Sequence, residues 1–241
     1  HNIIRETLNL ERFRTSQIEI TTLADIPSGT GLGSSGSFAT ALIKGLTAHN
    51  LNTIEAQELA QLACQIEIDI LNQPIGKQDQ YAAAFGGITS FTFKKDNSVI
   101  VKKISISQEI LIELEENLLL FFTGFIRDAN SILANQNKKT LLSDKKMIEN
   151  LNEVKKAGYE TMDLLKNGKF EEYGRLLNDH WERKKLRSKN MTNNHIDAIY
   201  ELGLKNGAYG GKVVGAGGGG FLMFLADDKT KLRKKMNEIN L

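Results

Sequence analysis

The sequence predicts an α+β protein in which strands and helices alternate along the chain. Short segments such as Gln17–Leu23 alternate in polarity, with Ile18, Ile20 and Thr22 on one face, which is typical of a strand. Longer segments such as Ile54–Leu71 repeat apolar residues at helical spacing. Because both kinds of segment recur throughout the 241 residues, we expect one large or two small domains of mixed helix and sheet.

The first half of the chain contains six expected elements. In chain order they are a strand at Gln17–Leu23, helices at Phe38–Leu46, Ile54–Leu71 and Lys77–Phe85, and two paired strands at Ile88–Phe93 and Val99–Ile104. Phe38, Leu42 and Leu46 are four residues apart, which places them on one face of the first helix. The Gly86-Gly87 pair ends the third helix.

The second half is expected to contain three strands and four helices. The strands are Leu118–Thr123, Gly211–Val214 and Phe221–Leu225, and the helices are Thr140–Lys166, Lys169–Arg187, Asn193–Lys205 and Asp227–Ile239. The last two strands are joined by a run of five glycines and one alanine at 215–220. We place a domain boundary near Ser105–Glu109, which gives domains at 1–105 and 106–241.

The composition limits the kinds of partner that the protein is expected to bind and the cellular compartment that it fits. The formal charge of +2 gives no indication of a nucleic-acid or membrane surface. The longest apolar runs, Leu118–Phe122 and Phe221–Ala226, are far shorter than the roughly 20 residues that span a bilayer. Cys64 is the only cysteine, which excludes an intrachain disulfide and a cysteine metal cluster and fits a reducing cytoplasm.

A run of glycine and serine residues, Ser28–Ser37, leads into the first expected helix. Backbone N–H groups at a helix N-terminus are unpaired and carry partial positive charge, which suits a phosphate group. Glycine lets the chain approach an anion closely, and the hydroxyls of Ser34, Ser35 and Ser37 can bind phosphate or Mg²⁺. The run therefore has the components of a nucleotide phosphate site.

Other interpretations fit this run less well. Gly31, Gly33 and Gly36 match the dinucleotide pattern G-x-G-x-x-G, but the acidic residue at the right distance, Glu55, lies at a helix start. A Walker loop needs a lysine that is absent here. A merely flexible loop does not account for so many glycines and serines directly before an apolar helix.

The segment Pro27–Gly36 resembles the phosphate loop of the GHMP kinases, the superfamily of galactokinase, homoserine kinase, mevalonate kinase and phosphomevalonate kinase. That loop reads P-x-x-x-G-L-G-S-S-A, and Gly36 replaces its alanine. The resemblance implies a two-lobed fold with a ribosomal protein S5-like N-terminal domain and a ferredoxin-like C-terminal domain, and the use of ATP and Mg²⁺. It assigns the nucleotide phosphates to Gly29, Thr30, Gly31, Leu32, Gly33, Ser34 and Ser35.

The segment Pro74–Gly87 resembles the corresponding stretch of bacterial heptose 7-phosphate kinases, G-K-Q-D-Q-Y-A-A-A-F-G-G. The resemblance implies that Asp79 is the catalytic aspartate, as a true base or as an electrostatic partner of the attacking hydroxyl. Without the resemblance, Asp79 would be interpreted as an acidic side chain in the first turn of a helix with no further role. Lys77 could lower the pKa of Asp79 or stabilise charge in the transition state, or it could point away from the site.

The resemblance also implies metal ligands. The family places a magnesium-binding glutamate on the preceding helix, and Glu67, twelve residues before Asp79, matches it. Ser35 is the second expected ligand. Asp69 is an alternative to Glu67, and a solvated helix face is the other interpretation of this polar run.

Three further segments resemble family motifs on the substrate side. The run 215–220 resembles the G-x-G-x-G-G motif, which makes Gly217 and Gly218 candidates for substrate binding. Thr123–Arg127 resembles T-G-x-x-R, so Arg127 is a candidate for holding a phosphate or hydroxyls, with a surface salt bridge as the alternative. Trp181–Lys184 resembles W-x-x-K; Lys184 faces either the substrate or solvent, and Trp181 is expected in the core.

Together these resemblances imply an ATP-dependent kinase for C1 of a heptose 7-phosphate. Kinases of galactose, fucose or another alcohol, and a non-catalytic domain that binds nucleotide or sugar phosphate, are the alternatives. The family motif P-x-R-x-x-x-x-G-G-x-x-T-D has no match before Pro27. We therefore expect this chain to be a fragment of a longer protein, without the N-terminal part of the fold. The expected partner is a small sugar phosphate, and the assembly state stays open, a homodimer included.

Overall fold

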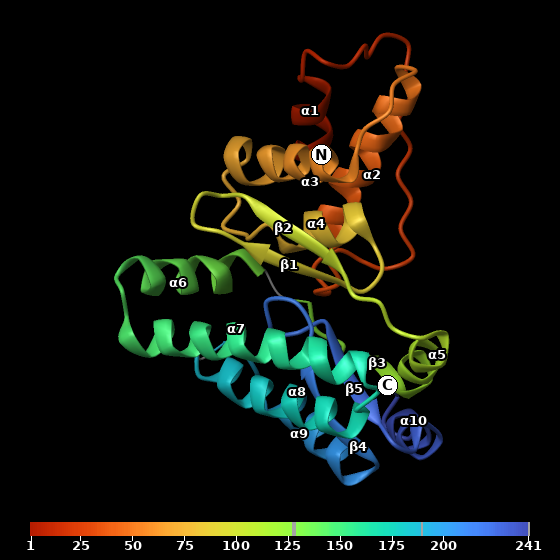
Figure 1. Ribbon diagram of the computed structural model, residues 1–241, viewed down its shortest axis with the longest axis vertical. Coiled ribbons are helices and arrows are strands. Elements are labelled where there is room, and N and C mark those ends of the chain that lie inside the picture. The colour runs from red at the N-terminus through yellow and green to blue at the C-terminus, as the bar shows by residue number, and fades with distance from the viewer. Residues whose placement is uncertain (127–128, 189, 241) are drawn as a thin grey trace. The chain divides into compact units, whose positions relative to one another are not determined.

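The computed structural model describes residues 1–126, 129–188 and 190–240 and divides into two compact units (Figure 1). The first unit comprises His1–Ser28 and Gly33–Lys103, and the second comprises Gly29–Leu32 and Ile104–Leu241. Four residues of the glycine–serine run therefore belong with the second unit. The expected mixture of helices and strands is confirmed in both units.

The first unit consists of helices and one hairpin. Its elements are α1 (Asn2–Leu8), α2 (Ser34–His49), α3 (Ala56–Cys64), the π-helix η1 (Gln65–Ile70), α4 (Gln78–Phe85), β1 (Thr89–Phe93) and β2 (Val99–Lys103). The apolar faces of α2, α3 and η1 form the core, which includes Ala39, Ile43, Leu59, Leu62 and Ile66. The strands pair antiparallel, with Phe91 opposite Val101, as the sequence predicts.

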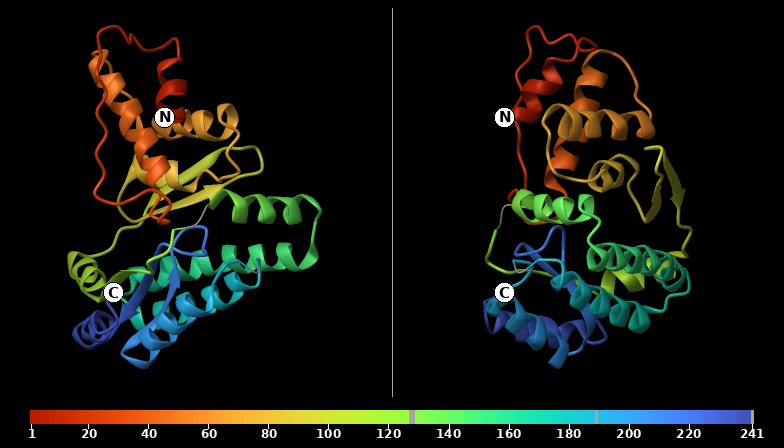
Figure 2. Two further views of the ribbon diagram at one scale, coloured as in Figure 1. Left: turned by 180° about the vertical axis from the view of Figure 1, so that it is seen from behind. Right: turned by 90° about the vertical axis from the view of Figure 1, so that its left-hand side faces the viewer.

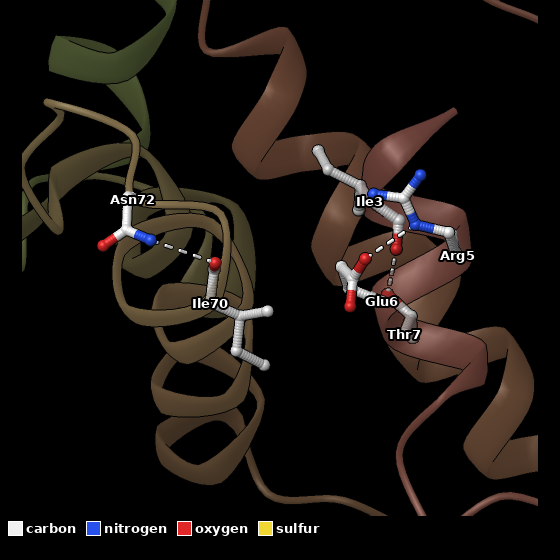
Figure 3. Close-up of polar contacts among 6 residues, drawn as sticks. All are labelled: Ile3, Arg5, Glu6, Thr7, Ile70 and Asn72. Atoms are coloured by element: carbon white, nitrogen blue, oxygen red, sulfur yellow. Dashed lines mark hydrogen bonds and ion pairs between the residues drawn. The ribbon is translucent and has the colours of Figure 1, made fainter.

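Helix α1, which the sequence analysis did not predict, packs against α2 and η1. Within it, Thr7 Oγ1 donates a hydrogen bond of 2.7 Å to the carbonyl of Ile3, and Arg5 pairs with Glu6 at 2.7 Å (Figure 3). Where η1 ends, Asn72 has a positive φ of 52° and its side-chain amide donates to the Ile70 carbonyl at 3.3 Å (Figure 3). Asparagine tolerates this left-handed conformation, so Asn72 stops the helix.

One expectation for the first unit is wrong, and another is confirmed with a change in the type of helix. Residues 17–23 are not a strand, because a strand needs a partner for its backbone hydrogen bonds and none of the described residues pairs with this segment. The expected helix 54–71 is α-helical only to Cys64, and it continues as a π-helix, in which each turn holds an additional residue. The local apolar period of the sequence shows neither that residues 17–23 lack a partner strand nor that the helix widens after Cys64.

The second unit is built around a three-stranded antiparallel sheet. Its elements are α5 (Gln108–Asn117), β3 (Leu118–Phe122), α6 (Ala129–Leu141), α7 (Lys145–Lys166), α8 (Phe170–Lys185), α9 (Asn194–Lys205), β4 (Ala208–Val213), β5 (Phe221–Ala226) and α10 (Lys229–Asn237). The strand order is β3-β5-β4, with Leu222 opposite both Phe121 and Val213. The central strand β5 is therefore buried, as its continuous apolar sequence requires.

Helix α8 packs closely on β4, and α7 lies along α8 (Figure 1, Figure 2). The close approach depends on Gly174 and Gly210, because a Cβ on Gly210 would lie 1.9 Å from the carbonyl oxygen of Gly174. Trp181 of α8 is fully buried in the core, as expected from the sequence. None of the described helices is long and apolar enough to cross a membrane.

The expected helix Thr140–Lys166 is confirmed over α7, but its start is wrong, since α6 ends at Leu141 and α7 begins at Lys145. Ser143 has a positive φ of 53°, and the Asp144 side chain caps α7 by accepting a hydrogen bond of 2.8 Å from the Met147 amide. The aspartate N-cap is the sequence signal that marks this boundary. Helix α5 and most of α6 were not predicted.

Candidate active site

The two glycine runs of the sequence contact each other within the second unit. The amide of Phe221 donates to the Thr30 carbonyl at 3.3 Å. A Cβ on Gly31 would lie 2.6 Å from the Val214 carbonyl oxygen, and a Cβ on Gly220 would lie 2.0 Å from that of Thr30. Side chains at these positions would separate the two runs, so their glycine content is explained by close backbone contact.

The remainder of the glycine–serine run forms the start of α2 in the first unit. Gly33 is the N-cap residue with a φ of 71°, and no side chain among the described residues caps this end of the helix. Ser34 and Ser35 occupy the first turn. The first N–H groups of this sixteen-residue helix are therefore available to an anion, which the helix dipole also attracts.

Asp79 lies against this helix start. A Cβ on Gly33 would lie 3.3 Å from Asp79 Cγ, and a Cβ on Gly36 would lie 3.0 Å from the carbonyl carbon of Asp79. Asp79 remains accessible to solvent, yet partial desolvation by the surrounding protein raises the pKa of its carboxyl group. The first unit thus brings a carboxylate suited to accept a proton next to a helix terminus suited to hold phosphate.

Glu67 and Gln80 form a buried pair beside this carboxylate. Glu67 in η1 is 1% exposed, and Gln80, which follows Asp79 in α4, is fully buried. The amide nitrogen Nε2 of Gln80 donates to Glu67 Oε2 at 2.7 Å. Gln80 Oε1 is buried without a partner among the described residues. Gln80 was not predicted from the sequence, in which its one signal is its position directly after the expected catalytic residue.

The donor set fits magnesium bound together with a nucleotide. No group of three His, Cys, Asp or Glu side chains in the described part of the chain could hold a metal ion. Mg²⁺, however, is typically held by one or two protein carboxylates plus substrate phosphates and water. The Glu67 carboxylate and the Ser35 hydroxyl supply oxygen ligands of this kind, and the buried, unpartnered Gln80 Oε1 indicates a polar environment at Glu67.

Lys77 is not directed toward Asp79. Its ammonium group donates to the backbone carbonyl of Asn97 at 3.3 Å and to the Asn97 side-chain oxygen at 3.4 Å, in the turn between β1 and β2. Burial is the cause of the raised Asp79 pKa. The outward alternative for Lys77 is the arrangement observed.

Lys184 is buried and holds the second glycine run. Its Nζ donates to the carbonyl of Val213 at 3.2 Å and to that of Gly215. Burial, with added repulsion from Lys212 and Arg187, lowers the pKa of Lys184 to about 7. The solvated alternative for Lys184 is therefore wrong, and the side chain instead fixes the end of β4.

The other substrate-side candidates lie around the same run. Gly217 and Gly218 are buried, and the Gly218 amide donates to the Met191 carbonyl at 2.7 Å. Arg127 lies outside the described residues. The amide of Thr123, which opens its motif, donates to the Gly220 carbonyl at 2.9 Å. The motifs at 123 and 215–220 are therefore joined by their backbones.

Comparison with known proteins gives matches in both halves of the chain. The family model for the GHMP kinases N terminal domain matches residues 2–87, and that for the GHMP kinases C terminal domain matches residues 161–240. D-glycero-alpha-D-manno-heptose 7-phosphate kinase of Campylobacter jejuni is 36% identical over 87% of this chain and 61% of its own length. Galactokinase of Pyrococcus furiosus is 28% identical over 86% of this chain and 64% of its own length.

Solved structures agree with these matches. A D-glycero-D-manno-heptose 1-phosphate kinase from Bacteriodes thetaiotaomicron has a TM-score of 0.70 and 29% identity, covering 91% of this chain and 60% of the other. A putative sugar kinase from Campylobacter jejuni has a TM-score of 0.67 and 33% identity, covering 89% of this chain and 60% of the other. The chain thus spans about three fifths of the length of these relatives.

Proposed function

Because the chain belongs to the GHMP kinase family, we propose that the protein transfers the γ-phosphate of ATP to a sugar hydroxyl, with C1 of a heptose 7-phosphate as the acceptor. The observation that carries the proposal is the contact of Asp79 with the start of α2. A phosphate held by the first N–H groups of α2 is then close to a carboxylate. The identity to a heptose 7-phosphate kinase supports the choice of acceptor.

In the proposed reaction, residues 29–35 hold the β- and γ-phosphates through backbone N–H groups and the serine hydroxyls. Asp79 accepts the proton of the attacking hydroxyl or orients it, and its raised pKa brings its proton affinity closer to that required of a base. Ser35 and Glu67 would hold Mg²⁺, which when bound neutralises phosphate charge. Positioning and charge stabilisation then supply most of the acceleration.

Lys184 and Lys77 have supporting roles in this proposal. Lys184 keeps the end of β4 and the run 215–220 in place, and that run holds Thr30 and Gly31 of the phosphate loop. Lys77 tethers the start of α4 to the β1–β2 turn. Arg127, Gly217 and Gly218 remain candidates for contact with the sugar. We place the reaction in the cytoplasm, where ATP is available.

The proposal is tested by measuring ADP formation with a panel of acceptors. We expect turnover with a heptose 7-phosphate and at least tenfold lower kcat/KM with galactose, fucose and mevalonate. Faster turnover with galactose or fucose would reassign the acceptor but retain the kinase. MgATP binding without turnover on any acceptor would instead support a non-catalytic binding domain.

A further inference from the structure

We propose that the second unit contains a further anion site, which binds a single phosphate-type oxyanion in a cavity between α7, α8 and β4. The proposal rests on the fold of this unit and is independent of the proposed kinase activity. It concerns the face of β4 that α8 covers (Figure 1). The residue on which the proposal depends most is Lys212, the last residue but one of β4.

The cavity has a volume of about 180 Å³. Four of its lining residues carry polar groups, namely Thr161 of α7, Tyr173 and His180 of α8, and Lys212 of β4. Sites for drug-sized ligands typically measure roughly 300–1,000 Å³. The cavity is therefore too small for a nucleotide and suits an inorganic oxyanion or one phosphate group, with hydroxyl, imidazole and ammonium donors around it.

Lys184, Arg187 and Lys212 form no ion pair with a carboxylate among the described residues, whereas the nearby Arg183 pairs with Glu153. Lys184 donates to two backbone carbonyls, and Arg187 donates from Nε to Asn150 Oδ1 at 2.6 Å while its Nη2 lies 3.5 Å from His180 Nε2. All of these partners are neutral. The side-chain ammonium of Lys212 has no hydrogen bond or ion pair with any other residue that the structure describes. Lys184 is buried, and Lys212 and Arg187 are partly buried. Charges withdrawn from water are normally paired, so this cluster favours an anion.

Repulsion between the positive groups contributes to the lowered pKa values of His180 and Lys212. Burial, with repulsion from Lys212, Arg187, Lys184 and Arg183, lowers the pKa of His180 to about 3. Burial and repulsion from Arg187 lower the pKa of Lys212. The neighbouring charges that act on these two groups are all positive. A bound oxyanion would reverse the sign of this field and stabilise the protonated forms.

An anion bound in this cavity would also affect the glycine run 215–220, through Lys184. Lys212 directly precedes Val213, whose carbonyl Lys184 holds. Shielding Lys184 from Lys212 favours its charged form, which makes the stronger hydrogen bond to the Val213 and Gly215 carbonyls. An occupied cavity would therefore stiffen the end of β4.

The test is thermal unfolding with increasing inorganic phosphate at constant ionic strength, with chloride as the compensating ion. It compares the wild type with Lys212→Met and with Lys205→Met, an exposed lysine of α9 that serves as a charge-matched control. We expect phosphate to raise the Tm of the wild type and of Lys205→Met. Lys212→Met should have a higher Tm without phosphate, because an unpaired charge is gone, and at least tenfold weaker phosphate binding.

Further arms separate this site from the phosphate loop and from a sugar-phosphate source. The phosphate response should persist with saturating MgATP, and it should be the same whether or not the protein turns over any sugar. A heptose 7-phosphate should give no additional Lys212-dependent shift if free phosphate is the ligand. Tyr173→Phe removes one hydroxyl and should weaken phosphate binding several-fold, which covers a failure of Lys212→Met to fold. Equal phosphate responses in the wild type, Lys212→Met and Tyr173→Phe would overturn the proposal.

Discussion

Two adjacent residues at the start of α4, Asp79 and Gln80, have different positions and different expected roles in the candidate site. Asp79 keeps its carboxylate accessible beside the α2 terminus, whereas the next side chain, Gln80, is buried on Glu67. Gln80 therefore acts as a positioning residue for the expected metal ligand. Partners of this kind commonly change metal affinity or activity by about 10- to 100-fold when removed.

We predict that Gln80→Leu raises the Mg²⁺ concentration needed for half-maximal turnover by about 10- to 100-fold. It leaves the buried Glu67 carboxylate without its donor, which should also cost about 1–3 kcal/mol of the free energy of unfolding in metal-free buffer. A Mg²⁺ titration and urea unfolding measure the two effects. Gln78→Leu, an exposed change on the same helix, is the control. An unchanged Mg²⁺ dependence in Gln80→Leu would remove Gln80 from the site.

Gly36 and Gly45 in α2 give a matched pair of substitutions. A Cβ on Gly45 meets nothing within 4 Å, so Gly45→Ala should raise the free energy of unfolding by about 0.5–1 kcal/mol through helix propensity. A Cβ on Gly36 would lie 3.0–3.1 Å from atoms of Asp79 and Gln80, so Gly36→Ala should stabilise the protein less than Gly45→Ala does. Equal stabilisation by the two changes in urea unfolding would contradict the described packing.

The buried Lys184 predicts a pH dependence of stability. Its pKa falls from 10.5 in the unfolded chain to about 7 in the folded protein. Between these values the unfolded state binds more protons, so the free energy of unfolding should rise as the pH increases from about 7 to 10.5. Unfolding of the wild type and Lys184→Met across this range tests the prediction. The variant should lose part of the rise, and parallel curves would show that Lys184 is not the source.

At the scale of elements, the two glycine runs behave as one structure because their backbones touch at Thr30 and Gly220. Gly220→Ala would place a Cβ 2.0 Å from the Thr30 carbonyl oxygen at a φ of 88°. We expect at least tenfold weaker binding of a non-hydrolysable ATP analogue. Isothermal titration measures this, with Gly158→Ala in α7, which meets nothing within 4 Å, as the control. Unchanged nucleotide binding in Gly220→Ala would show that the contact does not support the phosphate loop.

Elements with a strong apolar period were predictable from the sequence. Helices α2, α8 and α9 and the β1–β2 hairpin lie within a few residues of their expected positions, because each buries a continuous stripe or pairs with a neighbour in sequence. The prediction of a strand at residues 17–23 failed, because local sequence does not show whether a partner strand is present. The π-helical turn of η1 was not predicted, because the apolar period of the segment is the same as that expected for an α-helix.

The site was predictable to a similar degree. The glycine pattern and the position of Asp79 were visible as a linear motif, and the fold brings Gly33, Gly36 and Asp79 together. The contacts of Lys184 and Gln80 were not visible, because they join residues 29 and 13 positions away respectively. Charged residues in helices usually face solvent, and only tertiary structure shows that Lys184 is buried.

At the scale of the whole molecule, each of the two units has its own apolar core, and the proposed site residues are distributed over both. The phosphate loop passes from the second unit to the first between Leu32 and Gly33. Its first part is held by the run 215–220 and its second part begins α2. Nucleotide binding at the start of α2 is expected to protect the backbone amides of Ser34 and Ser35 from hydrogen exchange.

The central claim is that Asp79 acts on the acceptor hydroxyl beside a nucleotide held at the start of α2. The most direct test is a comparison of the wild type with Asp79→Asn in turnover and in MgATP binding. We predict that kcat falls by about 10²–10⁴-fold while the Kd for MgATP changes by less than about threefold. Asp79→Asn with near wild-type kcat would contradict the account.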